Sequence, residues 1–163
     1  MRSVTKQGSQ AVVQFDSNWK ALLECAALEV FEMMAGARLE PNPVGEEPRG
    51  EQTAMVGMAG ALCGMITLRC SRETSVRFAS LMLGGDAASN PSTARDALGE
   101  LCNMIAGNFK AKVSTLADHC MLSVPTVITG EDYAMETVEP TDGAVLALSF
   151  DGDPIWVSLI THT

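Results

Sequence analysis

Residues 92–113, "STARDALGELCNMIAGNFKAKV", carry the pattern on which the interpretation of this chain depends. Apolar side chains recur every three or four positions, which predicts one amphipathic helix. At about 100° per residue, a polar stripe then lies opposite the apolar side. The stripe consists of Asp96, Glu100, Asn103, Gly107 and Lys110. A rigid helix would thus present a carboxylate and a carboxamide to the same patch of solvent.

Two further segments have helical spacing. Residues 16–36 predict a second long helix, which Asp16 or Ser17 would cap and Gly36 would end in a left-handed conformation. Residues 71–85 predict a shorter helix. The expected core face of the first helix consists of Trp19, Leu22, Leu23, Ala26, Val30, Met33 and Met34.

The remaining apolar runs predict β-strands. They cover residues 52–60, 61–70, 120–130 with a break at Pro125, 131–140, 143–150 and 153–163. Helix, short strand and hairpin occur across 17–70 and again across 94–162, which suggests an internal pseudo-repeat. We therefore expect an N-terminal arm, 1–15, and a single α+β domain, 16–163. Its antiparallel sheet would carry two long pseudo-repeated helices on one side.

Composition narrows the possible partners. A formal charge of −9 argues against nucleic-acid binding and against docking on an anionic membrane surface. No run approaches the ~18–20 apolar residues of a membrane span. The five cysteines are scattered without a paired motif, which favours free thiols in the cytoplasm. Two histidines without clustered ligands predict no metal site.

By itself, a polar stripe on a helix is usually a solvated face. The longer spacing is more specific: Glu100 follows Asp96 by four residues, Asn103 follows by three, and Pro125 by twenty-two. This spacing resembles the signature of the CheC/CheX/FliY family of chemotaxis phosphatases. The order of elements, "FEMMAG" at 31–36 and "ASLMLGG" at 79–85 extend the resemblance to most of the chain, roughly 16–162.

The resemblance implies a function and a set of site residues. Family members dephosphorylate the response regulator CheY, whose phosphate is carried by an aspartate of its receiver domain. By carry-over, Asn103 would orient the attacking water and Glu100 would pair with a receiver lysine. Asp96, Gly107 and Lys110 would contact the partner. The protein would need no cofactor of its own, because the receiver supplies Mg²⁺.

The first long helix lacks part of the signature. Its matching positions are Lys20, Glu24 and Ala27, and an alanine has no group that holds a water. The resemblance therefore implies one active site per chain and the CheX-like branch, whose members are homodimers joined through their sheets. The alternatives are a module that binds a receiver without hydrolysis and a purely structural dimerisation domain.

Overall fold

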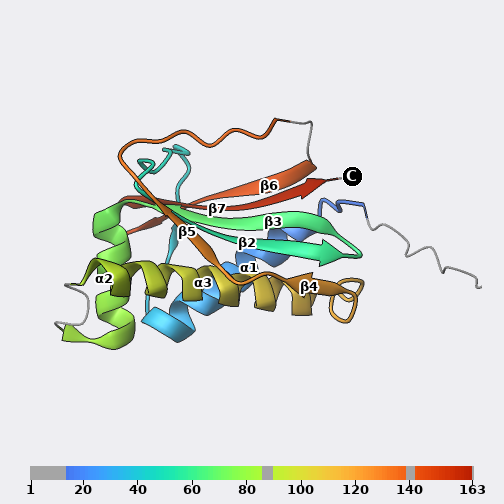
Figure 1. Cartoon of the computed structure of the whole chain (residues 1–163), viewed down its shortest axis with the longest axis horizontal. Coiled ribbons are helices and arrows are strands. Elements are labelled where there is room, and N and C mark those ends of the chain that lie inside the picture. Colours follow the sequence, from blue (N-terminus) through green and yellow to red (C-terminus); the bar gives the residue numbers. More distant parts are fainter. Residues whose placement is uncertain (1–13, 86–89, 139–141, 163) are drawn as a thin grey trace, which may run out of the picture.

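The computed structural model describes residues 14–85, 90–138 and 142–162. The described residues form a seven-stranded antiparallel sheet, with α1 and α3 packed on one face (Figure 1). The helices are α1 (Trp19–Ala35), α2 (Arg72–Leu83) and α3 (Pro91–Lys112). The strands are β1 (Glu40–Pro41), β2 (Gln52–Gly60), β3 (Cys63–Cys70), β4 (Cys120–Leu122), β5 (Thr126–Thr129), β6 (Asp142–Phe150) and β7 (Asp153–His162). The predicted α+β class is confirmed.

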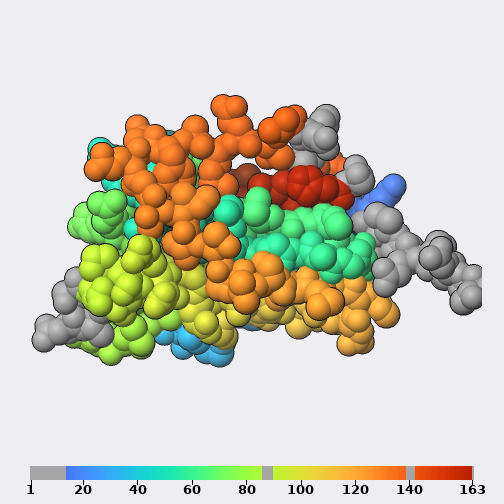
Figure 2. All heavy atoms as spheres, viewed as in Figure 1, coloured from blue at the N-terminus to red at the C-terminus, as the bar shows by residue number. Residues whose placement is uncertain are grey.

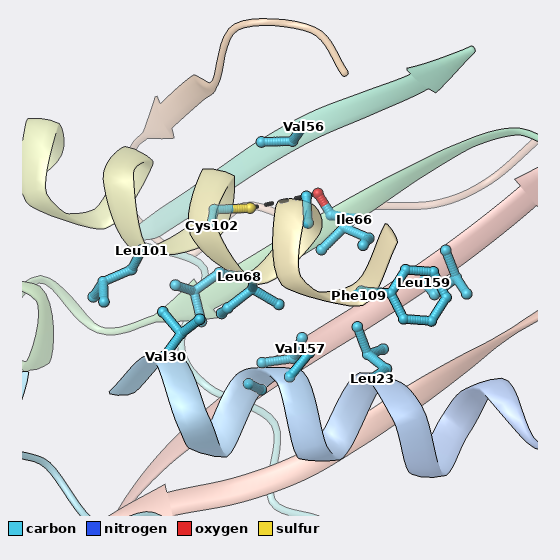
Figure 3. Packing of buried hydrophobic residues seen from close by; sticks show 14 of the residues in the cluster. Leu23, Val30, Val56, Ile66, Leu68, Leu101, Cys102, Phe109, Val157 and Leu159 are labelled. Carbon is cyan, nitrogen blue, oxygen red and sulfur yellow. Dashed lines mark hydrogen bonds between the residues drawn. The ribbon is translucent and has the colours of Figure 1, made fainter. Parts of the chain in front are cut away.

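The core lies between the sheet and the two long helices. Leu23 and Val30 of α1 face Leu101 and Phe109 of α3, and strand residues such as Val56, Ile66, Leu68, Val157 and Leu159 complete the layer (Figure 3). Cys102 belongs to the same layer, and its Sγ lies 3.6 Å from the carbonyl oxygen of Ile66. Burial raises the pKa of this thiol to about 12, so it stays neutral and acts as a small apolar side chain.

The order of strands across the sheet is β1-β6-β7-β3-β2-β4, and β5 also pairs with β2. The β1 strand, from the first half of the chain, pairs with β6 of the second half. Conversely, β4 and β5 of the second half pair with β2 of the first half. The short strands of each half thus pair with the hairpin of the other half: β1 with the β6–β7 hairpin, and β4 and β5 with the β2–β3 hairpin. This arrangement suits the pseudo-repeat of 17–70 and 94–162, which stays a prediction.

Pro125 interrupts the strand run 120–130, as predicted. The chain leaves β4 at Leu122 and resumes pairing in β5 at Thr126. Between them, the Ser123 N–H donates to the carbonyl of Gly57 at 2.9 Å, and the Gly57 N–H donates to Ser123 Oγ at 2.8 Å. These two hydrogen bonds keep the segment attached to β2 across the interruption, where Pro125 packs on α3.

The first helix differs from the prediction at its start and along one side. Asn18 occupies the N-cap position, and the carboxylate of Asp16 instead accepts the backbone N–H of Asn18 at 2.8 Å. Gly36 ends the helix with φ 58°, as expected. Met33, predicted to face the core, is 67% exposed because it lies at the edge of the apolar stripe, beyond the reach of the sheet.

Residues 131–138, part of the segment predicted as a strand at 131–140, form no strand in the structure. The segment is held through Tyr133 instead of through a ladder. The Tyr133 N–H donates to the carbonyl of Gly50 at 3.1 Å, and its hydroxyl lies 2.6 Å from Thr53 Oγ1. Arg69 donates to the Tyr133 carbonyl at 3.0 Å. The partners of Tyr133 in these contacts are distant in sequence, so local propensity did not reveal them.

Glu29 of α1 connects the two long helices at their surface. Its carboxylate accepts a hydrogen bond from Asn108 Nδ2 at 2.8 Å and another from Lys112 Nζ at 3.0 Å, both on α3. The Cys25 thiol donates a third at 3.3 Å. Together these hydrogen bonds, that of Asn108 first, lower the pKa of the Glu29 carboxyl from 4.5 to about 2.

This contact predicts an acid dependence of stability. A carboxyl with a lowered pKa stabilises the fold above its unfolded pKa, and that contribution is lost as the pH falls toward the folded pKa. The difference in unfolding free energy between the wild type and Glu29→Gln should therefore be largest above pH 4.5 and shrink toward pH 2. Urea titrations across this range measure it, with Glu40→Gln, an exposed carboxylate, as the control. A difference independent of pH would contradict the assignment.

Candidate active site

The predicted polar stripe lies along the outer side of α3. Asp96 and Glu100 are exposed, whereas Asn103, Gly107 and Lys110 are half-buried. Because the helix rises about 1.5 Å per residue, Glu100 and Asn103 are separated by only about 4.5 Å along its axis. Among the residues that the structure describes, the side chains of Glu100 and Asn103 have no hydrogen-bond partner. Their polar groups are therefore available to a molecule that docks on α3.

Local sequence explains where this helix begins and ends. Asn90 caps its start by accepting the Ser92 N–H at 3.0 Å, and Pro91 occupies the first turn, where its missing N–H has no helical partner to lose. Lys110 and Lys112 lie in the last turn, where positive charge interacts favourably with the negative end of the helix dipole. Phe109 anchors the inner side, with its ring 6.1 Å from that of Trp19.

Pro125, the fourth position of the signature, lies against the same helix. A Cβ placed on Gly99 would come within 3.5 Å of Pro125 Cβ and within 3.4 Å of Val127 Cγ2. The β4–β5 segment thus packs directly on the backbone of α3 beside Glu100. Figure 2 shows this segment, in orange, against the olive and yellow atoms of the helix. Folding therefore brings Pro125 to the helix that carries the other three signature positions, at the residue before Glu100.

On its other side, Asn103 borders a groove between α1 and α3. The apolar lining comes from Val30, Met33, Met104 and Gly107, and Glu32 lies at the rim. Sequence reasoning missed this groove and the contact of Glu29 with Asn108 and Lys112. The spacing of four residues between Asn108 and Lys112 was a local signal that both point the same way, but their partner on α1 is distant in sequence.

The matching positions on α1 form a different surface. Lys20 and Glu24 line a depression together with Pro41, which lies on the short strand β1. A proline beside the helix thus occurs in both halves. Ala27, at the position that corresponds to Asn103, is completely buried. The helix α1 therefore has no amide at this position; the amide that lines the depression, that of Asn42, belongs to the chain after β1. One active site per chain stays a prediction.

Within residues 14–85, 90–138 and 142–162, no cluster of three or more His, Cys, Asp or Glu side chains could hold a metal ion. Nor does any helix of this part of the chain have the length and apolar character of a membrane span.

A chain with this sheet, these two long helices and this signature falls into the CheC/CheX/FliY class. It matches the family described as Chemotaxis phosphatase CheX over residues 52–150 and belongs to that family. The CheY-P phosphatase CheX of Thermotoga maritima is 32% identical over 84 residues, 51% of this chain and 54% of that protein. The matched region thus spans about half the length of this curated relative.

Two solved structures have the same fold. A putative chemotaxis protein from Desulfovibrio vulgaris Hildenborough gives a TM-score of 0.78 at 21% identity and covers 89% of this chain and 97% of its own. A chain of the CheX-CheY-BeF3-Mg²⁺ complex from Borrelia burgdorferi gives 0.72 at 21% identity and covers 92% and 100%. The resemblance drawn from the spacing of Asp96, Glu100, Asn103 and Pro125 is confirmed.

Proposed function

We propose that this protein hydrolyses the aspartyl phosphate of a CheY-type receiver domain, with Asn103 and Glu100 as the residues that act on it. The observation that carries the proposal is their placement side by side on the outer face of α3, without internal partners in the described structure, next to Pro125. Membership of the CheX family and a relative named as a CheY-P phosphatase support it.

Asn103 is the residue that we assign to the attacking water. In the reaction, the water oxygen forms a bond to phosphorus while the bond from phosphorus to the receiver's aspartyl oxygen breaks. The aspartate is released as a carboxylate, and the water protons leave with inorganic phosphate or pass to solvent. Phosphoryl transfer depends mainly on positioning and charge stabilisation. A neutral amide holds a water without adding negative charge beside the phosphate.

Glu100 is the residue that we assign to recognition of the receiver. A carboxylate one turn from Asn103 is far enough from the phosphorus to avoid strong repulsion, yet it can accept hydrogen bonds from a lysine of the partner. Such a pair would fix the register of the two proteins and so place Asn103. Mg²⁺ bound by the receiver would neutralise charge on the phosphoryl oxygens. The Borrelia complex, which contains CheY, BeF3 and Mg²⁺, supports the placement of Mg²⁺ in the partner.

Asp96, Gly107 and Lys110 are proposed to contact the receiver around this pair. Gly107 is the most informative of them. A glycine in a helix interior costs about 1 kcal/mol relative to alanine. A Cβ at Gly107 would meet nothing within 4 Å, and its φ is not positive, so the fold does not require glycine there. The absence of a side chain at Gly107 would let a docking partner approach the helix closely, which explains a glycine at this position.

Two wider assignments belong to the same proposal. We infer action in the cytoplasm, where receivers and unpaired thiols occur, and a homodimer joined through the sheets. The second candidate function is a module that binds a receiver without hydrolysis. The exposed apolar side chains Met121 and Val124, close to Pro125, favour docking but do not themselves supply chemistry.

The test is the lifetime of receiver phosphate. CheY-type receivers of the source organism are phosphorylated with a small phosphodonor, freed of the donor, and followed with and without this protein. We expect at least one receiver to lose phosphate about tenfold faster or more, as positioning of a water predicts. Binding without acceleration for every receiver would contradict hydrolysis and leave the binding module.

A further inference from the structure

The groove between α1 and α3 is open and apolar where it meets Asn103. Val30 is completely buried at its base, and Met104 lies half-buried beside it. Met33 stands at its edge with 67% of its surface exposed. On the α3 side of the groove, a Cβ placed on Gly107 would meet nothing within 4 Å, so this wall is open as well. The groove therefore has the size and lining for an apolar side chain from outside.

The charge around the groove restricts what can enter it. Glu29 and Glu32 both border it on the α1 side. Glu29 is already engaged by Lys112 and Asn108. Glu32 makes no ion pair with any described residue, so one negative charge remains at the rim. An occupant with a lysine or arginine next to its apolar side chain would satisfy both features.

We propose that this groove receives an apolar side chain of the receiver domain, flanked by a basic residue that faces Glu32. The inference rests on the proposed function, because Asn103 belongs both to the groove and to the site. A receiver seated over Asn103 must cover neighbouring surface, and the groove is continuous with that surface. Met33 and Glu32 then determine which receivers are accepted, while Asn103 acts on the phosphate.

The test replaces Met33 by glutamate. Because the side chain is exposed, the variant should fold normally, which circular dichroism verifies. We expect its Kd for a receiver loaded with BeF3 and Mg²⁺ to rise about tenfold or more, as for an interface residue that makes a large contribution. Its KM should rise in parallel while kcat stays within about twofold. Met33→Leu should behave as wild type.

Val44→Glu is the matched control, because Val44 is 86% exposed, lies in the loop between β1 and β2, and does not line the groove. It makes the same change of charge and should alter neither Kd nor KM. Glu32→Lys should weaken binding more than Glu32→Gln. An unchanged Kd and KM for Met33→Glu would overturn the groove assignment.

Variants of Gly107 test the groove independently of Met33. Gly107→Ala should weaken receiver binding, and Gly107→Leu, which fills more of the groove, should weaken it further. Since affinity for the BeF3-loaded receiver is measured without turnover, the two proposals fail separately. If Met33→Glu weakens binding but the wild type hydrolyses no receiver phosphate, only the proposed hydrolysis is contradicted. If the wild type hydrolyses receiver phosphate and Met33→Glu has the same Kd and KM, only the groove assignment is contradicted.

Discussion

Asn103→Ala should reduce the rate of receiver dephosphorylation by about a hundredfold or more, because misplacing a reacting group costs roughly that factor. Affinity for a BeF3-loaded receiver should remain close to that of the wild type. The amide has no hydrogen-bond partner among the described residues, and alanine is the best helix former, so stability should not fall. Single-turnover kinetics and binding measurements on the same preparations check both parts.

Two further variants make this result specific. Asn103→Asp keeps the shape of the side chain and adds a negative charge, and it should also lose turnover, because that charge repels the phosphate. Asn18→Ala is the matched control, because Asn18 is exposed at the start of α1 and its side chain makes no capping bond. A rate for Asn103→Ala equal to that of the wild type would remove this residue from the reaction.

Glu100→Ala should lose docking and turnover together. Hydrogen bonds to charged groups contribute about 1.5–3 kcal/mol, which corresponds to roughly ten- to more than a hundredfold in Kd. In contrast to Asn103→Ala, the loss should appear in KM and in Kd for the BeF3-loaded receiver. Higher receiver concentration should restore part of the rate, and added salt should reduce the difference from the wild type.

The two halves of the chain supply a close control for this variant. Glu24 holds the position in α1 that Glu100 holds in α3, and it is also a helical glutamate beside a proline. Because Ala27 replaces the amide there, Glu24→Ala should leave dephosphorylation unchanged. Equal losses for Glu24→Ala and Glu100→Ala would mean that both helices engage receivers, contrary to one site per chain.

Those parts of the fold that depend on local pattern could be predicted from the sequence. The apolar period of 92–113 predicted α3, and the apolar runs 143–150 and 153–163 predicted β6 and β7. Asp151 and Gly152, a pair typical of tight turns, connect these two strands, and both residues have positive φ. Features that depend on distant partners could not. Tyr133 and its contacts override the strand propensity of 131–138, and Met33 lies just outside the surface that the sheet covers.

The candidate site shows the same division. The spacing of Asp96, Glu100 and Asn103 places them on one helix face by geometry alone. The position of Pro125 beside Gly99 needed the β4–β5 segment to pair with β2, which no local rule supplies. The groove at Met33 could not be predicted either, because it forms only where α1 packs against α3. Sequence thus identified the residues of the stripe, whereas structure identified the surface around them.

The exchange of short strands between the halves has a consequence for folding. Glu40 of β1 pairs with Ser149 of β6, so this edge of the sheet closes only after residue 149 has been synthesised. Pairings between such distant residues slow folding, because loop closure must precede them. A fragment that ends at α3 would also leave β2 as an open edge, which invites aggregation. The two halves should therefore fold as one cooperative unit, and cutting the chain between them should yield no independently folded piece.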